Sequence, residues 1–305
     1  MADSPPSPVV VQAAQVFLID VSAAMDETWL AAARESVAAA LGRLRPGTLF
    51  AIIAGTETAC MVYPPGNQLA IADPRTLAEA RQALGSLAAG TGGIAVGRWL
   101  RQARLLLQPY PEAIRQAQLL VAGNFDREST ADLTDSIAQC EGVFRCDCRG
   151  VGTNWNAGQI RRISDTLLGT LDIMPDPRGL AADVAELTDR AMARSAADVR
   201  LRLHPAEWAR PLFVKQLAPD VKDLTNRYTS PPDLATARDY PTGAWQPGES
   251  RDFHVGLEVT PGELNVPMRA ALVSALLTEP SGTTRELGSE AIQVEWRVGP
   301  ILRDR

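Results

Sequence analysis

The stretch FLIDVSAAMDET, Phe17–Thr28, decides the first element of the fold. The apolar run that leads into it, from Gln15, has the continuous hydrophobic character of a strand buried on both faces. It stops at Asp20, and after a turn of small residues, apolar side chains recur every three or four positions over residues 28–43. That spacing predicts an amphipathic helix. Asp20 and Ser22 are therefore expected at the carboxyl end of a buried strand, just before a helix.

Outward from this stretch, short apolar runs and helical stretches alternate over the first 195 residues. Strands are expected at residues 15–20, 48–55, 58–64, 116–123, 143–152 and 169–175, and helices at 28–43, 74–87, 95–107, 129–139, 156–167 and 180–194. The run at 58–64 is expected to be an edge hairpin partner of the run before it. Strands that alternate with helices predict an α/β fold, with a doubly wound, mostly parallel sheet. Such sheets bind ligands at the carboxyl ends of their strands.

The pattern changes near residue 196. Val199, Leu201 and Leu203 alternate with polar residues, as in a half-buried antiparallel strand, and further short runs are separated by turns rich in Pro and Gly. We therefore expect a Pro/Ser-rich flexible tail over residues 1–14, an α/β domain over 15–195 and a small all-β sandwich over 196–305. The stretch at residues 239–255 is expected to be a turn-rich loop that enters a strand, and residues 251–261 form one of the short alternating runs.

Composition limits the function classes. Of 305 residues, 46% are hydrophobic and 22% charged, which is ordinary for a globular protein. The formal net charge of −6 and the lack of a basic block disfavour nucleic-acid binding. The sequence contains no run of 18 apolar residues and no basic region near its start. We therefore expect a cytoplasmic protein that does not bind a membrane.

Catalytic chemistry has little support in the sequence. The only two histidines, His204 and His254, both lie in the expected β-domain, and no arrangement of Ser, His and Asp or of Cys and His suggests a nucleophile. Cys140, Cys146 and Cys148 lack the spacing of a zinc knuckle. A redox switch and a thiolate metal site remain open for them beside the simpler interpretation as small buried side chains. We expect a protein that is not an enzyme.

Four segments together resemble the von Willebrand factor A family, bacterial cytosolic type with a following β-domain. The family's D-x-S-x-S motif resembles Asp20–Ala24, its G-G-T-A-I-G loop resembles GGIAVG from Gly92, its L-L-T-D-G segment resembles LLVAG from Leu119, and its G-V-G-T-D segment resembles GVGTN from Gly150. The resemblance covers about residues 15–194. It implies a Rossmann-like fold and an octahedral Mg²⁺ site, the metal-ion-dependent adhesion site, at the strand ends.

Carried over residue by residue, the resemblance leaves that site incomplete. Asp20 and Ser22 keep two of the five oxygen donors, whereas Ala24, Ile94 and Ala122 occupy the other three positions. Because Mg²⁺ dehydrates reluctantly and demands near-ideal geometry, we expect no bound cofactor, or at best weak, water-mediated Mg²⁺ binding. Nearby oxygens that would have to substitute come from Asp26, Thr91, Asn124 and Asp126. Asp20 and Ser22 also have a purely structural interpretation, as acceptors for loop N–H groups.

Two functions stay open. The first is a non-enzymatic interaction or scaffolding module that binds another protein through a less polar strand-end face, formed by Asp26, Thr91, Ile94, Ala122, Asn124, Asp126 and Trp155. On this interpretation Ile94→Asp weakens partner binding and shifts the melting temperature by only a few degrees. The alternative is a metal-dependent adhesion module with a rebuilt site. The resemblance implies a signalling or ATPase partner for such a module.

Overall fold

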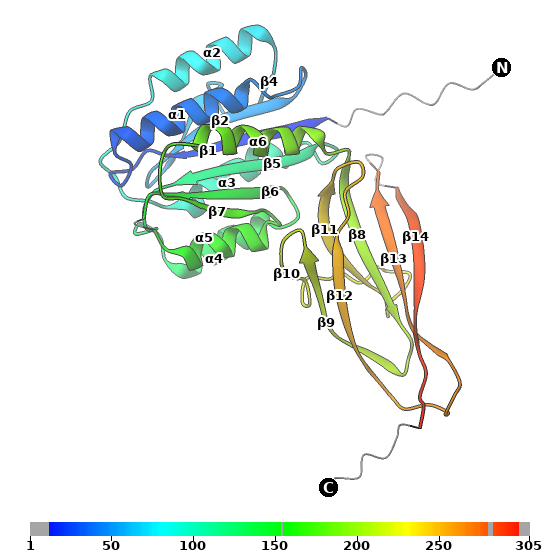
Figure 1. Cartoon of the computed structure of the whole chain (residues 1–305). Helices are drawn as coiled ribbons and strands as arrows, with labels where there is room; N and C mark the ends of the chain where they lie inside the picture. The colour runs from blue at the N-terminus through cyan, green and yellow to red at the C-terminus, as the bar shows by residue number, and fades with distance from the viewer. Residues whose placement is uncertain (1–11, 154, 280–282, 299–305) are drawn as a thin grey trace, which may run out of the picture. The chain divides into compact units, whose positions relative to one another are not determined.

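The computed structural model describes residues 12–153, 155–279 and 283–298. The chain divides into two compact units, coloured from blue to green and from green to red in Figure 1. The first reaches Ala197 and also takes in Ala244–Pro247, while the second begins at Asp198 and continues from Gly248. Of the tail expected over residues 1–14, residues 1–11 lie outside the described part. Ala13 and Ala14 correct that expectation, because they already belong to the first strand.

The first unit is built on a mostly parallel sheet with the strand order β3-β2-β1-β5-β6-β7. The described strands are β1 (Ala13–Asp20), β2 (Leu49–Gly55), β3 (Ala59–Tyr63), β4 (Ala70–Ile71), β5 (Ile114–Val121), β6 (Arg145–Val151) and β7 (Leu171–Met174). Only β3 and β4 run antiparallel, both against β2. The doubly wound parallel sheet and the edge hairpin at β3 are thus confirmed. The two-residue strand β4 was not predicted from the sequence.

Helices cover both faces of this sheet (Figure 1). They are α1 (Glu27–Leu41), α2 (Pro74–Gly85), α3 (Val96–Leu107), α4 (Thr130–Cys140), α5 (Ala157–Thr166) and α6 (Leu180–Ala193). Side chains alternate along β1, so Val16 and Leu18 join the core with α3, α4 and α5, whereas Phe17 and Ile19 join the core with α1, α2 and α6. Every residue of β1 is buried. The strand order reverses at β1, between β2 and β5, so the carboxyl end of β1 is the position where doubly wound sheets place their ligands.

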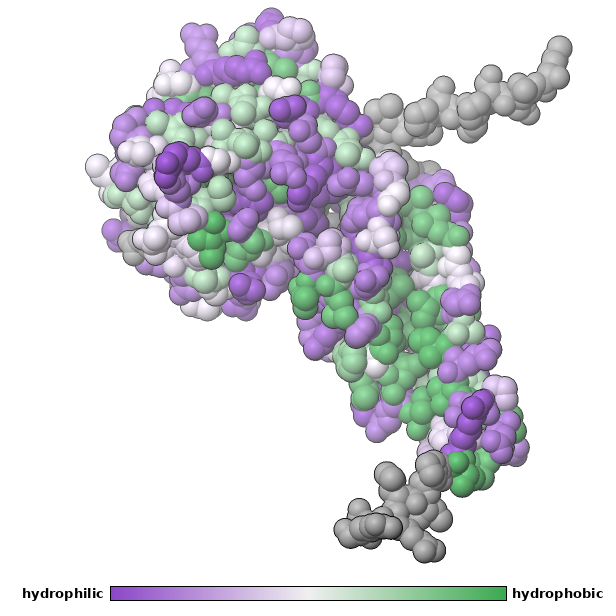
Figure 2. All heavy atoms as spheres, in the orientation of Figure 1, coloured by the Kyte–Doolittle hydropathy of each residue, from purple (hydrophilic) through white to green (hydrophobic). Residues whose placement is uncertain are grey.

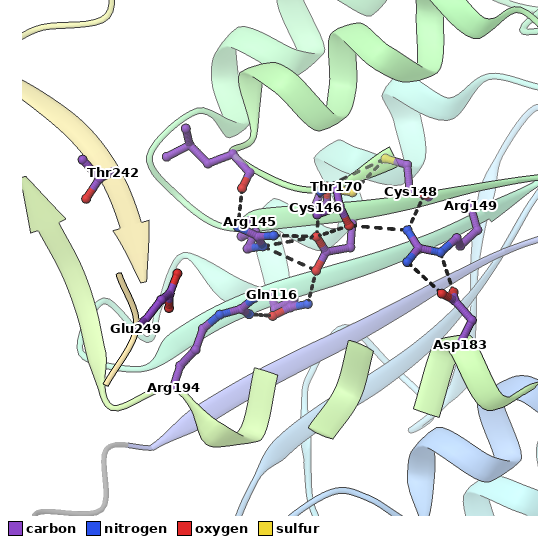
Figure 3. A network of polar contacts seen from close by, with 12 residues as sticks. Gln116, Arg145, Cys146, Cys148, Arg149, Thr170, Asp183, Arg194, Thr242 and Glu249 are labelled. Atoms are coloured by element: carbon purple, nitrogen blue, oxygen red, sulfur yellow. Dashed lines mark hydrogen bonds and ion pairs between the residues drawn. The ribbon is translucent and has the colours of Figure 1, made fainter. Parts of the chain in front are cut away.

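The amino-terminal half of β5 and β6 carries a buried polar network (Figure 3). Asp147 accepts hydrogen bonds from Gln116 Nε2, from Arg145 and from the backbone and hydroxyl of Thr170. Burial would raise the pKa of Asp147, but the guanidinium groups of Arg145 and Arg194 and these hydrogen bonds lower it to about 2. The network is distinct from the strand-end face, because its residues precede the carboxyl ends of their strands.

The second unit contains two antiparallel sheets, of strand order β10-β9-β12 and β11-β8-β13-β14. Its described strands are β8 (Ala196–Pro205), β9 (Ala209–Ala218), β10 (Lys222–Asp223), β11 (Arg238–Trp245), β12 (Asp252–Val259), β13 (Met268–Thr278) and β14 (Thr284–Val294). The all-β character is confirmed. The turn-rich loop expected over residues 239–255 is corrected in its first half, which forms β11, whereas the strand that it was expected to enter is present as β12. Tyr240 of β11 is buried and packs against Tyr228.

Candidate functional site

Asp20 ends β1 and is the centre of the strand-end face. Its Oδ1 accepts a hydrogen bond from the backbone N–H of Ser22 at 2.8 Å, and its Oδ2 accepts one from the backbone N–H of Ala122 at 2.9 Å. The side chain is fully buried. Burial raises the pKa of Asp20, opposed by the hydrogen bonds from Ala122 and Ser22. Both carboxylate oxygens are therefore already engaged by the protein backbone, and they link the loop after β1 to the loop after β5.

Ser22 and its neighbours complete the first loop. The Ser22 hydroxyl is also fully buried and accepts a hydrogen bond from the backbone N–H of Ala24 at 3.2 Å. The glycine-rich loop before α3 is joined to it by two backbone bonds, from Gly90 to Val21 and from Ala23 to Gly92. The structure thus brings the predicted first and second loops together at the end of β1.

Gly123 shows how closely the third loop approaches the other two. A Cβ built on Gly123 would lie 2.6 Å from the Ala24 Cβ and 2.7 Å from the Ile94 Cδ1. Two apolar side chains therefore press against the backbone of this loop, and only glycine leaves room for them. At the positions where the family resemblance expects oxygen donors from a Ser and a Thr, this chain places carbon atoms in contact.

Two residues expected on the docking face are buried instead. Ile94 is 2% exposed and Ala122 is 5% exposed, and Ile94 packs with Trp99 and other side chains of the core on the α3 side. Their side chains cannot offer contact area to a partner, and this corrects the expectation for both. It also corrects the mild effect expected for Ile94→Asp, because that substitution would bury a carboxylate. The sequence did not indicate this burial, because an apolar residue in a loop can lie either on the surface or in the core.

The accessible part of the face is its rim. Ala23, Ala24, Thr91 and Asn124 are exposed. Asp26 is exposed as well and caps α1, accepting a hydrogen bond from the backbone N–H of Trp29 at 2.9 Å. The rim therefore combines small apolar groups with polar ones of modest size.

Asp126, which was expected on the docking face, and the nearby Glu128 are acceptors for backbone N–H groups. Asp126 Oδ1 accepts from the backbone N–H of Ile94 at 2.8 Å, and Glu128 accepts from the backbone N–H of Gly97 at 2.9 Å. Burial raises the pKa of Glu128 in spite of that bond. The first turn of α3 needs such acceptors because Ala95, at its cap position, has no oxygen in its side chain. The missing cap was the signal in the sequence that a carboxylate from elsewhere is required.

An ion pair lies at one side of the strand-end face. Arg127 Nε lies 3.1 Å from Glu57 Oε1 and 3.7 Å from Asp126 Oδ2, and each of these side chains is about half exposed. Neither Glu57 nor Arg127 was among the predicted site residues, since nothing local in the sequence links the end of β2 to the loop after β5. The pair places a permanent positive charge beside the acidic rim.

Trp155 turns back onto the sheet. Its indole Nε1 donates to the backbone oxygen of Gly152 at 3.0 Å, and its ring lies against Gly150, where an added Cβ would be 2.8 Å away. The side chain is partly buried and packs against the core on the α3 side. It lies at the carboxyl end of β6, as expected, but only part of the ring is accessible to a partner.

The three cysteines lie in the same core. Cys146 and Cys148 are neighbours on one face of β6, with sulfurs 3.9 Å apart, and Cys140 Sγ lies 3.4 Å from the backbone oxygen of Leu100. Burial raises the pKa of Cys140 to about 12, and contact with Cys148 together with burial raises that of Cys146. Thiolates are therefore disfavoured at Cys140 and Cys146. Within the described residues, no group of three or more His, Cys, Asp or Glu side chains is placed to hold a metal ion.

Comparison with known proteins agrees with this architecture. The family described as "von Willebrand factor type A domain" matches residues 14–173. A solved structure described as von Willebrand factor type A from Catenulispora acidiphila is 40% identical, with a TM-score of 0.91 over 94% of this chain and 67% of that one. The ArnB paralog VWA2 from Sulfolobus acidocaldarius is 15% identical, with a TM-score of 0.53 over 96% of this chain and 68% of that one, and shares the fold. No curated protein matches.

Proposed function

The chain belongs to the von Willebrand factor type A family, and from that premise we propose that it is a non-enzymatic protein-interaction module whose strand-end face binds a protein partner without a metal ion. Domains of this family commonly mediate protein binding. We propose further that the protein acts in the cytoplasm, as a scaffold. No described helix has both the length and the apolar character needed to cross a membrane.

The packing around Gly123 carries this proposal. Ala24 and Ile94 press their methyl groups against it from two loops, and Ala122 supplies only its backbone N–H to Asp20. Mg²⁺ needs six oxygen ligands at 2.0–2.1 Å in near-ideal octahedral geometry. The residues present do not fit such an ion, because both oxygens of the Asp20 carboxylate already accept backbone N–H hydrogen bonds and the positions of Ala24, Ile94 and Ala122 present carbon where the ion needs oxygen.

The rim supports a protein ligand. Exposed Ala23 and Ala24 offer a small apolar patch, and Thr91, Asn124 and Asp126 surround it with hydrogen-bonding groups. Interfaces are typically built in this way, with an apolar centre and a polar edge. The loops beneath are tied together by Asp20 and by backbone bonds, so the face is held in place before a partner arrives.

The alternative function is a metal-dependent adhesion module, in which Asp26, Asn124 and Asp126 rebuild the ion site and a signalling or ATPase partner completes it. Asp126 already uses one oxygen on Ile94 and Asp26 one on Trp29, which weakens this alternative. The two functions make opposite predictions for a chelator. Binding through a metal is lost in EDTA, whereas binding to a metal-free face persists.

Ala24→Arg tests the proposed face. The substitution places a long charged side chain at an exposed position of the rim, and we expect it to reduce capture of the partner from a lysate of the native host about tenfold, as for a central interface residue. The measurement is quantitative mass spectrometry of proteins retained by the immobilised chain, with and without EDTA.

Ala78→Arg is the matched control. Ala78 is exposed on α2, so the same substitution is made outside the rim. We expect Ala78→Arg to retain as much of the partner as the wild-type chain does. We also expect the wild-type chain to retain as much partner in EDTA as without it. Equal retention by Ala24→Arg would show that the partner binds elsewhere, and loss of retention in EDTA would favour the metal-dependent alternative.

A further inference from the structure

The second unit exposes a regular sheet edge at β12. This strand pairs with β9 on one side, and in the strand order of the described residues no strand follows it on the other. The two irregularities in the pairing both fall on β9, where Leu212 and Leu217 are skipped in the register. β12 itself runs without interruption over its eight residues. Its free N–H and C=O groups therefore form a ready template for another strand.

The sequence of β12 is symmetric in character about its centre. In FHVGLEV, residues 253–259, Gly256 is flanked by Val255 and Leu257, then by His254 and Glu258, then by Phe253 and Val259. His254 and Glu258 are exposed, whereas the four apolar side chains are partly buried. The strand thus has one polar and one apolar face. On the apolar face, positions at equal distances on either side of Gly256 both carry apolar side chains. On the polar face, the equivalent positions carry an imidazole on one side and a carboxylate on the other.

We propose that β12 pairs antiparallel with β12 of a second copy of this chain, about a twofold axis at Gly256. In that register Val255 lies opposite Leu257 of the second copy and Phe253 opposite its Val259, so apolar side chains meet on the apolar face. On the polar face His254 lies opposite Glu258 of the second copy, and the symmetry repeats this complementary pair. The dimer joins two three-stranded sheets into one and removes both free edges.

Gly256 suits the centre of such an interface. An added Cβ there would lie 2.4 Å from the ring of Phe213, so the aromatic ring of β9 already covers this position on the polar side. The two strands can therefore approach at the twofold axis without opposing side chains. Glu258 also lies 2.8 Å from Arg210 Nε, which orients its carboxylate on the exposed face.

The other edges of the described sheets carry features that discourage pairing. β14 has a bulge at Leu287, in the middle of the strand, and β11 contains Pro241, which lacks an N–H. β3, β7 and β10 are only five, four and two residues long. β12 combines length and regularity with a histidine and a carboxylate that complement each other across the twofold axis, and a bulged or proline-containing edge does not.

Sedimentation equilibrium of the full chain tests the proposal. We expect the wild-type chain to reach the mass of two chains at roughly 100 µM or below, the range of weak but specific complexes. His254→Glu places a carboxylate opposite Glu258 twice per dimer and should raise the dissociation constant about tenfold or more. A wild-type chain that stays monomeric throughout this range would overturn the proposal.

A mixing experiment separates lost pairing from misfolding. Glu258→Lys alone should also weaken the dimer, but an equimolar mixture of His254→Glu chains with Glu258→Lys chains restores opposite charges across the axis and should restore association. Arg285→Glu, on the bulged edge of β14, is the control and should leave the dissociation constant within about twofold. Dissociation by Arg285→Glu, or no recovery on mixing, would contradict pairing through β12.

Discussion

Ile94→Asp is expected to lower the free energy of unfolding of the first unit by about 4 kcal/mol or more, because it puts an unpaired carboxylate where an apolar side chain is buried. Ile94 is 2% exposed, and its Cδ1 lies against the backbone of Gly123. Asp126, whose carboxylate already accepts from the Ile94 N–H, would add repulsion to the new charge. Urea denaturation followed by far-ultraviolet circular dichroism measures the effect.

Ala24→Asp is the matched control for that experiment. Ala24 also faces Gly123, but it is exposed, so a carboxylate there stays hydrated and stability should change by only about 0.5 kcal/mol. If both variants were equally stable, Ile94 would have to lie on the surface, and the packing that excludes a metal ion from this site would be wrong.

Restoring the three missing donors together is expected to create a divalent-cation site. Ala24→Ser, Ile94→Thr and Ala122→Asp would add two hydroxyls and one carboxylate around Asp20 and Ser22. We expect Mg²⁺ binding with a dissociation constant of roughly millimolar or tighter, in the range of weak protein sites for hard cations. Isothermal titration calorimetry of the triple variant measures it, and the loss of core packing at Ile94 should lower its stability by about 1–3 kcal/mol.

The control for the triple variant adds Asp20→Ala, which removes the anchoring carboxylate and should abolish the new heat signal. A folded triple variant that binds no Mg²⁺ would mean that the loops do not place these three positions around Asp20 as the structure has them.

Elements with strong local signals were predicted well. The continuous apolar run of β1 and the 3–4 spacing of α1 depend on residues close together in sequence, and the structure has each within one or two residues of its predicted place. β4 and β11 were missed because their pairing depends on distant strands. A two-residue strand at Ala70 and a strand that contains Pro241 carry little signal of their own.

The candidate site also has features that the sequence predicts and features that depend on distant contacts. The meeting of the loops around Asp20 followed from the position of strand ends in a doubly wound sheet, and the structure brings Ala24, Ile94 and Ala122 to that end. Burial could not be read from sequence, because whether Ile94 faces solvent or core depends on how closely Gly123 approaches. The Glu57–Arg127 ion pair joins residues 70 positions apart, so no local sequence pattern indicates it.

The central claim is that this strand-end face works without a metal ion, and calorimetric titration of the wild-type chain with Mg²⁺ and with Mn²⁺ tests it most directly. After treatment with a chelator, we predict no saturable heat for either ion up to millimolar concentration. A saturable signal of one ion per chain that disappears in Asp20→Ala would contradict the account.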